Sequence, residues 1–396
     1  MKVRQITQQI VLEGRNHNLD WFHPKAAVIP PKVEGQPPTV LVTAHLVSGN
    51  DAFSPLFEIE THDLGATWTE PVMHLSSLGR HRLEEHLYEG IIDFAPKYHP
   101  QTDTVLGIGH TARYINKADD VSLKREFLDH SNYPRYTAYA VKDLKSDTWA
   151  PWQALVPPDE PRMAYFSVGG CSQHLYQPDG TVLVAARWKG APEEKTRAGT
   201  ILCEFDGTQM RAIKAGNDLV ETAGRGFAEP SIVHYQDRYL MTLRAENFRM
   251  WHSSSRDGLN WDLQQPWCWD DGEEIETDQT QQHWLKRHDE LYLIYTRKSE
   301  LNHGVMRCRA PLFMAQVDTD RLSLIRETEQ IVIPENRARL GNFMVENVTP
   351  WESWVTVGEW VQTEYIGDLL LGRIEWTEPN LEPVATGGAV PPALRS

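Results

Sequence analysis

Residues 61–68 read Thr61-His62-Asp63-Leu64-Gly65-Ala66-Thr67-Trp68 and fit the pattern S/T-x-D-x-G-x-T-W without a mismatch. Each fixed position has a structural task. The aspartate can accept hydrogen bonds within a turn, the glycine adopts backbone angles that other residues disfavour, and the tryptophan packs between sheets. The octapeptide therefore predicts a tight turn on the outside of a β-sheet, anchored by Trp68.

Two further segments resemble this turn less closely. Residues 254–261 (SSRDGLNW) keep the spacing from glycine to tryptophan and shift the aspartate by one place, and residues 142–149 retain a weaker copy. A turn motif that recurs along a chain indicates a repeated structural unit.

The hydrophobic pattern repeats in the same way, as an apolar run, a polar turn and a second apolar run. Six such hairpins, spaced by roughly fifty to seventy residues, lie in residues 23–46, 90–110, 168–187, 226–244, 280–297 and 343–360. Further strand-like segments follow them, at residues 53–61, 135–141, 200–205, 250–254, 311–317 and 368–374. Four antiparallel strands per unit, repeated radially, are typical of a propeller blade.

We therefore predict an all-β fold, a six-bladed β-propeller that occupies residues 1–396 as one domain, or seven-bladed if an insertion conceals a further unit. The last unit lacks an outer strand, whereas Val3–Leu12 is a strand without a hairpin of its own. Pairing this N-terminal strand with the last blade would close the ring.

The turn motifs resemble the Asp-box repeats of the sialidase superfamily, and the blade pattern extends this resemblance over nearly the whole chain. The resemblance implies an arginine before an Ile-Pro pair in the first blade, one of three that hold the substrate carboxylate. Residues 21–30 (WFHPKAAVIP) contain the Ile-Pro pair but no arginine, so His23 or Lys25 would have to substitute. The resemblance also implies a tyrosine nucleophile in the last blade, for which Tyr365 is the candidate.

Composition excludes several partners. The net charge is −16 without a block of lysines or arginines, which disfavours nucleic acid. No apolar run is long enough to span a bilayer, and the N-terminus is too polar for a signal peptide. The four cysteines have neither metal-like nor disulfide-like spacing, so a reduced, cytoplasmic setting is expected. The oligomeric state is left open.

No cofactor and no catalytic metal are predicted. Residues 270–274 (DDGEE) are acidic but lie between two units, where a solvated loop is expected. A structural calcium ion is left open.

Polar residues stand where consecutive strands of each unit should open on the same face. The second strands end in His45, His110, Arg187, Arg244 with Glu246, Arg297 and Glu359. The first strands contribute His23, Glu89, Asp93, Gln173, Glu229, Gln282, His283 and Asn342. Buried polar groups are costly unless paired, so these residues are expected to bond to one another or to a ligand. Gln173 and Gln282 could equally brace the channel.

Three arginines, Arg187, Arg244 and Arg297, end equivalent strands of consecutive units. A guanidinium group suits bidentate binding of a carboxylate, so they predict an acidic sugar as the ligand, a uronate or a sialate. The alternative is that Glu229, Glu246 and Glu359 neutralise them in a buried network.

Three functions are compatible with this set of residues. A sialidase-like exo-glycosidase would use carboxylates such as Asp93, Glu229, Glu246 and Glu359 together with Tyr365. A lyase that eliminates at a uronate, of the rhamnose-glucuronate type, would use a neutral base among His23, His110 and His283, with arginines stabilising the carbanion. The third function is glycan binding without turnover.

Overall fold

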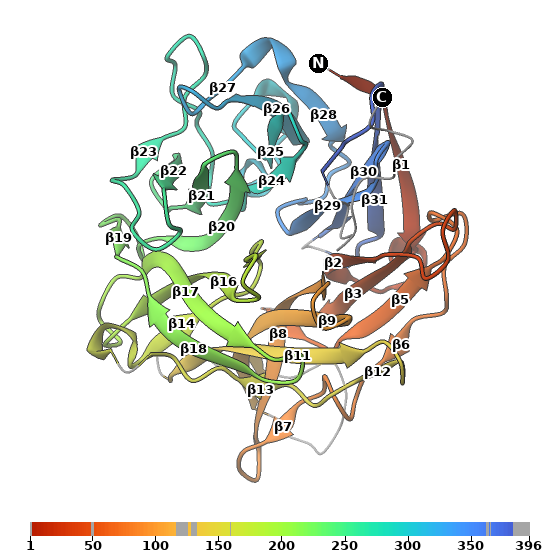
Figure 1. The fold of residues 1–396 in the computed structure, drawn as a ribbon, viewed down its shortest axis with the longest axis vertical. Coiled ribbons are helices and arrows are strands. Elements are labelled where there is room, and N and C mark those ends of the chain that lie inside the picture. Colours follow the sequence, from red (N-terminus) through yellow and green to blue (C-terminus); the bar gives the residue numbers. More distant parts are fainter. Residues whose placement is uncertain are drawn as a thin grey trace.

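The computed structural model describes residues 2–48, 51–115, 126–127, 133–158, 160–361, 364 and 366–382, with only the backbone at 126–127. Within these ranges the chain is all-β, and its strands surround a central axis in a propeller arrangement (Figure 1). The short 3-10 helices are Arg15–His17, Pro161–Met163, Glu300–Asn302, Met306–Cys308 and Arg326–Thr328. No helix in the described ranges combines the length and apolarity needed to cross a membrane.

Four of the five sheets in the described chain contain four or five strands each. The first consists of β2 (Trp21–Ile29), β3 (Thr39–Ser48), β4 (Ala52–Phe53), β5 (Phe57–Thr61) and β6 (Val72–Met73). Another contains β20 (Ala228–Tyr235), β21 (Arg238–Arg244), β22 (Met250–Ser255) and β23 (Gln265–Pro266). The next contains β24 (His283–Lys286), β25 (Leu291–Tyr295), β26 (Leu312–Asp318), β27 (Ser323–Leu324) and β28 (Gln330–Ile333). The last contains β1 (Val3–Leu12), β29 (Phe343–Thr349), β30 (Glu352–Gly358) and β31 (Leu369–Trp376).

The remaining sheet has 13 strands and two regions. One region holds β7 (His81–Arg82), β8 (Leu87–His99), β9 (Thr104–Ile115), β10 (Glu126–Phe127), β11 (Arg135–Asp143), β12 (Thr148–Trp149) and β13 (Gln153–Ala154). The other holds β14 (Phe166–Val168), β15 (Leu175–Tyr176), β16 (Val182–Lys189), β17 (Arg197–Phe205), β18 (Met210–Ala215) and β19 (Leu219–Val220). A short parallel pairing joins them, with Arg135 opposite Phe166 and Tyr136 opposite Ser167.

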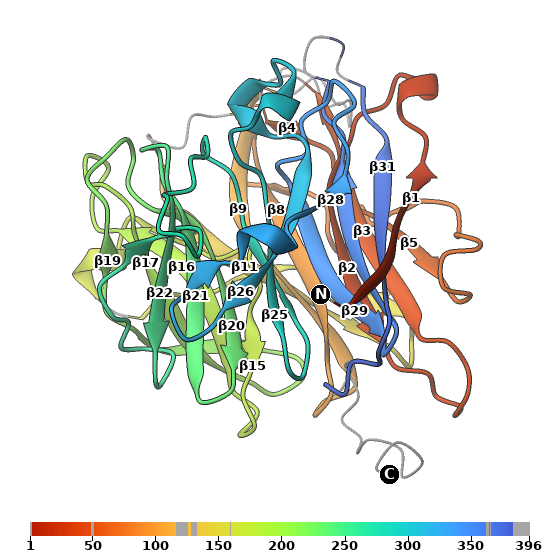
Figure 2. The ribbon, with the colours of Figure 1, turned by 90° about the horizontal axis from the view of Figure 1, so that it is seen from above.

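The N-terminal strand closes the ring, as the sequence predicts. β1 pairs antiparallel with β31, from Val3 opposite Trp376 to Leu12 opposite Leu369. The two strands lie side by side in both views, and Figure 1 shows β1 at the edge of the molecule (Figures 1 and 2). An edge strand of the last sheet is thereby covered, because β1 satisfies the backbone groups that β31 would otherwise expose.

Apolar side chains fill the spaces between neighbouring sheets. Ile294 and Met314 of one sheet pack in the same buried cluster as Val355 and Ile374 of the next. The core is therefore divided among the sheet interfaces, and each sheet depends on its neighbours around the ring.

The turn at residues 61–68 has the structure that its sequence predicts. Asp63 Oδ1 accepts a hydrogen bond from the Thr67 backbone N–H at 2.9 Å, and Asp63 Oδ2 accepts one from the Thr67 hydroxyl at 2.7 Å. Gly65 has a φ of 77°, in the left-handed region. The Trp68 ring lies 6.1 Å from that of Trp354, so the turn packs against the last sheet.

The second copy begins one residue later than predicted. Ser255, rather than Ser254, donates its hydroxyl to Asp257 Oδ1 at 3.1 Å and accepts the Gly258 N–H at 3.0 Å. This turn is therefore one residue shorter than the first. Trp261 ends it, buried, and donates its indole N–H to the Thr200 hydroxyl at 3.1 Å.

Removal of residues 1–13 should lower the melting temperature sharply or make the protein insoluble, because β31 then becomes an open edge and the last sheet loses part of its core. Arg4→Ala is the matched control, since Arg4 is an exposed residue of the same strand. Differential scanning calorimetry of the two variants provides the measurement. An unchanged melting temperature of the truncated protein would contradict closure by β1.

The two tryptophans of the outer turns should differ in their contribution to stability. Trp261→Ala removes a buried ring and should lower the free energy of unfolding by roughly 3–5 kcal/mol. Trp68→Ala should cost less, because Trp68 is only half-buried. Urea unfolding of both variants measures the difference, and equal losses would show that the turns are equivalent despite their packing.

Candidate functional site

Three strands carry the same irregularity where they approach the axis. In β2, β8 and β20, two consecutive residues stand opposite a single residue of the next strand, which is a β-bulge. The first residue of each bulge has a positive φ, 51° at His23, 55° at Asp93 and 44° at Glu229. Left-handed backbone is unfavourable for side chains of this size, and such strain concentrates at functional sites.

The ends of the second strands supply the opposing side chains. His110 of β9 pairs with Ile92, next to the bulge at Asp93, and Arg244 of β21 pairs with Ala228, next to the bulge at Glu229. Arg187 of β16 occupies the same place in its sheet, opposite Val168.

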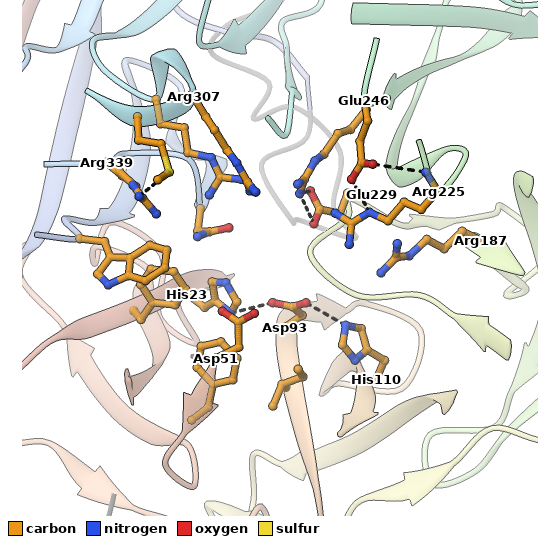
Figure 3. Close-up of a pocket in the computed structure, with 18 of the residues that line it drawn as sticks. His23, Asp51, Asp93, His110, Arg187, Arg225, Glu229, Glu246, Arg307 and Arg339 are labelled. Atoms are coloured by element: carbon orange, nitrogen blue, oxygen red, sulfur yellow. Dashed lines mark hydrogen bonds and ion pairs between the residues drawn. The ribbon is translucent and has the colours of Figure 1, made fainter. Parts of the chain in front are cut away.

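These residues line one pocket of about 480 Å³ (Figure 3), within the roughly 300–1,000 Å³ range of ligand pockets. Its lining is Phe22, His23, Asp51, Phe53, Ile92, Asp93, His110, Arg135, Arg187, Arg225, Glu229, Arg244, Glu246, Met306, Arg307, Arg309, Arg339, Asn342 and Trp360. Seven arginines thus face four carboxylates, in a protein whose overall charge is −16.

Asp93 stands between two histidines. Its Oδ1 lies 2.6 Å from His23 Nδ1, and its Oδ2 lies 2.8 Å from His110 Nε2. Burial disfavours the charged carboxylate, but His23 and His110 outweigh it and hold the pKa of Asp93 well below its ordinary value. Asp93 is therefore an anion that orients both rings.

His110 is a neutral ring. Burial lowers its pKa to about 4, and the charge of Arg135 acts in the same direction. Arg135 Nη2 lies 2.8 Å from His110 Nδ1, so Nδ1 accepts from the arginine while Nε2 donates to Asp93. The ring is thus held at both nitrogens.

The backbone of Gly170 and Cys171 supports the bulge at Asp93. The Cys171 N–H donates to the Asp93 carbonyl at 2.9 Å. A side chain at Gly170, which has a φ of 110°, would place its Cβ 3.0 Å from the same carbonyl oxygen. Glycine at position 170 therefore allows this close approach.

Two of the pocket arginines are paired with glutamates. Arg244 Nη1 donates to both oxygens of Glu229 at 2.6 Å, and Arg225 Nε lies 2.8 Å from Glu246 Oε1. Burial opposes ionisation of Glu229, but Arg244 outweighs it and lowers the pKa of Glu229 to about 2. Glu229 is accordingly a charged partner of an arginine, the alternative that the sequence left open.

One group of side chains has the composition of a metal site. The ligand atoms of His23, Asp93 and Cys171 lie within 4.8 Å of one another. Burial raises the pKa of the Cys171 thiol well above its ordinary value, which opposes the thiolate that a soft metal prefers. The carboxylate of Asp93 is also engaged by both histidines, through a hydrogen bond with His110 and a 2.6 Å contact with His23, so the trio fits an array of polar contacts better than a metal centre.

Several predicted site residues do not line this pocket but link neighbouring strands in the interior. Lys25 Nζ donates to the Phe343 carbonyl at 2.6 Å. Gln173 bridges to the backbone of Trp284, Gln282 accepts from the Thr242 hydroxyl at 2.8 Å, and His283 Nδ1 lies 3.1 Å from the Ser231 hydroxyl. All four brace the channel.

Arg297 and Glu359 also lie elsewhere. Arg297 binds Glu329 with two hydrogen bonds of 2.8 and 2.6 Å, so it does not join Arg187 and Arg244 as the sequence predicts. Glu359 accepts from Arg15 Nε at 2.8 Å and lines a different pocket, beside β1. Tyr365, the predicted nucleophile, lies outside the described residues.

Sequence reasoning missed the arginines that come from outside the first two strands of each unit. Arg135 begins a third strand, Arg225 precedes β20, and Arg307, Arg309 and Arg339 belong to connections. The usable signal was the arginine-rich stretch at residues 307–309 (RCR), because a connection from a second to a third strand opens on the same face as the site.

No protein-family model matches the sequence, and no curated protein does. Solved structures do match. A protein of unknown function from Dyadobacter fermentans has a TM-score of 0.66 at 14% identity, covering 94% of this chain and 100% of that one. Trypanosoma rangeli sialidase in complex with the inhibitor DANA has a TM-score of 0.63 at 13% identity, covering 94% and 60%. A mutant NanB sialidase from Streptococcus pneumoniae has 0.63 at 10% identity, covering 90% and 68%.

The fold is a sialidase-like β-propeller. This chain spans only 60% of the trypanosomal enzyme, and identities of this order establish the fold alone. The reaction of this sialidase-like propeller must therefore be inferred from the residues of its pocket.

Acid should destabilise this sialidase-like propeller from near pH 6.5 downward. Burial lowers the pKa of His45 to about 3 and that of His110 to about 4. An unfolded chain protonates these rings near pH 6.5, whereas the folded protein does not, so stability is lost as the pH falls from about 6.5 to 4. Asp93 and Glu229 add a further loss below about pH 4, since their folded pKa values are depressed.

The measurement is the melting temperature between pH 7.5 and 4.5. His110→Asn keeps a donor for Asp93 but removes one titrating ring, so its curve should be flatter than that of the wild type. His86→Asn, at an exposed histidine, should follow the wild-type curve. A flat wild-type curve would show that the buried histidines are charged in the folded state.

Proposed function

We propose that this protein is an enzyme that cleaves an acidic glycan by elimination at a uronate residue. The observation that carries the proposal is the His23–Asp93 pair in an arginine-lined pocket. Because Asp93 Oδ1 lies 2.6 Å from His23 Nδ1, we assign the ring proton to Nδ1, which leaves the Nε2 lone pair as a base. No hydrogen bond of Nε2 is formed with the described part of the chain.

The reaction balances with these groups alone. His23 Nε2 removes the proton from the carbon that bears the carboxylate, and the electron pair forms a double bond to the neighbouring carbon. The C–O bond at that neighbouring carbon breaks, and the leaving oxygen takes up a proton, which the imidazolium of His23 can return. Arg135 and Arg187, on one wall, stabilise the negative charge that spreads onto the carboxylate in the transition state.

The sign of the developing charge favours elimination over hydrolysis. Glycoside hydrolysis passes through a positively charged, oxocarbenium-like transition state, whereas proton removal beside a carboxylate develops negative charge. A pocket with seven arginines and four carboxylates destabilises the positively charged transition state of hydrolysis and stabilises the negative charge that develops in elimination.

The ionisation state of the pocket carboxylates also favours elimination over hydrolysis. A hydrolase needs a protonated acid beside the glycosidic oxygen. Asp93 and Glu229 both have a pKa below the ordinary value, and Glu246 is engaged by Arg225. These three carboxylates are therefore poorly suited to donate a proton at neutral pH.

Hydrolysis is the second candidate, because two of the solved structures that share this fold are sialidases. In that case Tyr365 would be the nucleophile, as the resemblance implies, Glu229 would be one of the available carboxylates, and Arg187 and Arg244 would hold the substrate carboxylate. Glycan binding without turnover is the outcome expected if neither reaction occurs.

We further propose six blades for the propeller. The support is that the two regions of the 13-stranded sheet, β7–β13 and β14–β19, are joined only by the two-residue parallel pairing of β11 with β14. Each region also begins and ends with antiparallel pairs, as a separate blade would.

The test is incubation with a panel of uronate- and sialate-containing oligosaccharides, with products read by mass and by ultraviolet absorbance. Elimination produces a conjugated double bond and adds no mass, whereas hydrolysis adds one water. His23→Gln should reduce kcat by roughly 10²–10⁴-fold, since it removes the base. His86→Gln, at an exposed histidine that does not line the pocket, is the matched control and should retain full activity. Products with an added water would overturn elimination in favour of hydrolysis.

A further inference from the structure

The charges within the pocket are incompletely balanced. Arg244 is paired with Glu229, and Arg225 with Glu246. The third buried carboxylate, Asp93, is engaged by histidines. Within the described chain, four of the pocket arginines have no carboxylate at ion-pair distance, namely Arg135, Arg187, Arg307 and Arg309.

These four arginines form two groups on different walls. Arg135 and Arg187 both lie over the Phe166 ring, with Cζ 5.7 and 5.2 Å from its centroid. Arg307 and Arg309 belong to the connection between β25 and β26. Figure 3 shows Arg187 and Arg307 on opposite sides of the pocket, with Asp93 between and below them. Arg244 belongs to neither group, because it is already paired with Glu229.

On each wall, burial and neighbouring positive charges disfavour the charged form of an arginine, and a bound anion would offset this effect. Burial lowers the pKa of Arg187 to about 9, and the repulsion from Arg225 exceeds the attraction from Glu229. Burial also lowers the pKa of Arg309 to about 9. Arg244 adds repulsion, the attraction of Glu229 offsets part of it, and Arg307 adds further repulsion. The buried Nε of Arg309 has no hydrogen-bond partner in the described chain, although its Nη2 donates to the Gln279 carbonyl at 3.0 Å. A buried, unpaired donor of this kind indicates a missing acceptor.

The two walls lie on opposite sides of the pocket (Figure 3). The carboxylate of the scissile uronate belongs beside Arg135 and Arg187, on the wall that also holds His110 next to the His23–Asp93 pair. The wall of Arg307 and Arg309 then faces another part of the same ligand.

We propose that the substrate carries a second oxyanion, which Arg307 and Arg309 bind while Arg135 and Arg187 hold the uronate carboxylate. This inference rests on the proposed function, because it assigns the first anion to the cleaved sugar. The second anion is a sulfate ester or the carboxylate of an adjoining uronate, both of which offer a planar or tetrahedral set of oxygens to guanidinium groups. The substrate class is therefore a doubly anionic oligosaccharide.

The experiment compares three ligands by isothermal titration calorimetry: a uronate disaccharide with a neutral neighbour, a diuronate, and the first disaccharide carrying one sulfate ester. The catalytically impaired His23→Gln protein is used, so that binding is measured without turnover. We expect a preference of roughly tenfold or more for at least one doubly anionic ligand, as one charge-assisted contact implies. The ligand that shows this preference identifies the source of the second anion.

Arg307→Ala is then introduced, since Arg307 is exposed and its removal does not threaten folding. The preference for the doubly anionic ligand over the disaccharide with a neutral neighbour should fall to a small fraction of its starting value. Arg256→Ala, at an exposed arginine outside the pocket, is the matched control and should retain the preference.

The two proposals fail in different ways. Equal affinity for all three ligands, or a preference that Arg307→Ala leaves intact, would overturn the second-anion site even if the wild type performs elimination. A preference that depends on Arg307, combined with products that contain an added water, would support the second-anion site and overturn elimination.

Discussion

The pairing of β1 with β31 joins the N-terminal strand to the last sheet, and with it the two ends of the ring. Apolar side chains lie between neighbouring sheets, so each sheet needs one on either side. A closed ring leaves the strands nearest the axis no freedom to separate, and their polar ends must share a small volume. The pocket is the result, because strands far apart in the sequence can present His23, Asp93 and Glu229 to one another only when the circle is complete.

Within that ring the site is made by local irregularity. A regular strand alternates its side chains between the two faces of its sheet, so it points none of them along the axis. The bulges at His23, Asp93 and Glu229 break this alternation and turn one side chain into the pocket from each of three sheets. The second strands then supply His110 and Arg244 directly beside two of the bulges. The residues with irregular backbone geometry are thus the ones whose ionisable side chains enter the pocket.

Much of this could be predicted from the sequence, for reasons that are local. The alternation of apolar and polar residues locates the hairpins, and the unpaired segment Val3–Leu12 indicates how the ring closes. The end of a second strand is also recognisable, which is why Arg187 and Arg244 were assigned to the pocket. Arg297 has the same sequence context, but its partner Glu329 lies 32 residues further along and could not be identified without the fold. Arg307 and Arg309 could not be placed either, because the course of a connection depends on what it packs against.

The three bulges have a consequence for how this protein could change over time. A left-handed residue with a large side chain costs on the order of 1–3 kcal/mol. Each of the three sheets therefore holds its pocket residue at a position where the left-handed backbone would cost less energy for glycine or asparagine. Selection for stability alone would erode these positions, and the side chains persist only while the pocket's chemistry is under selection. Conversely, the backbone shape is already present, so a different side chain placed at residue 23, 93 or 229 would project into the same pocket without a new fold. The pocket side chains can thus be replaced in one sheet without a change in the other two.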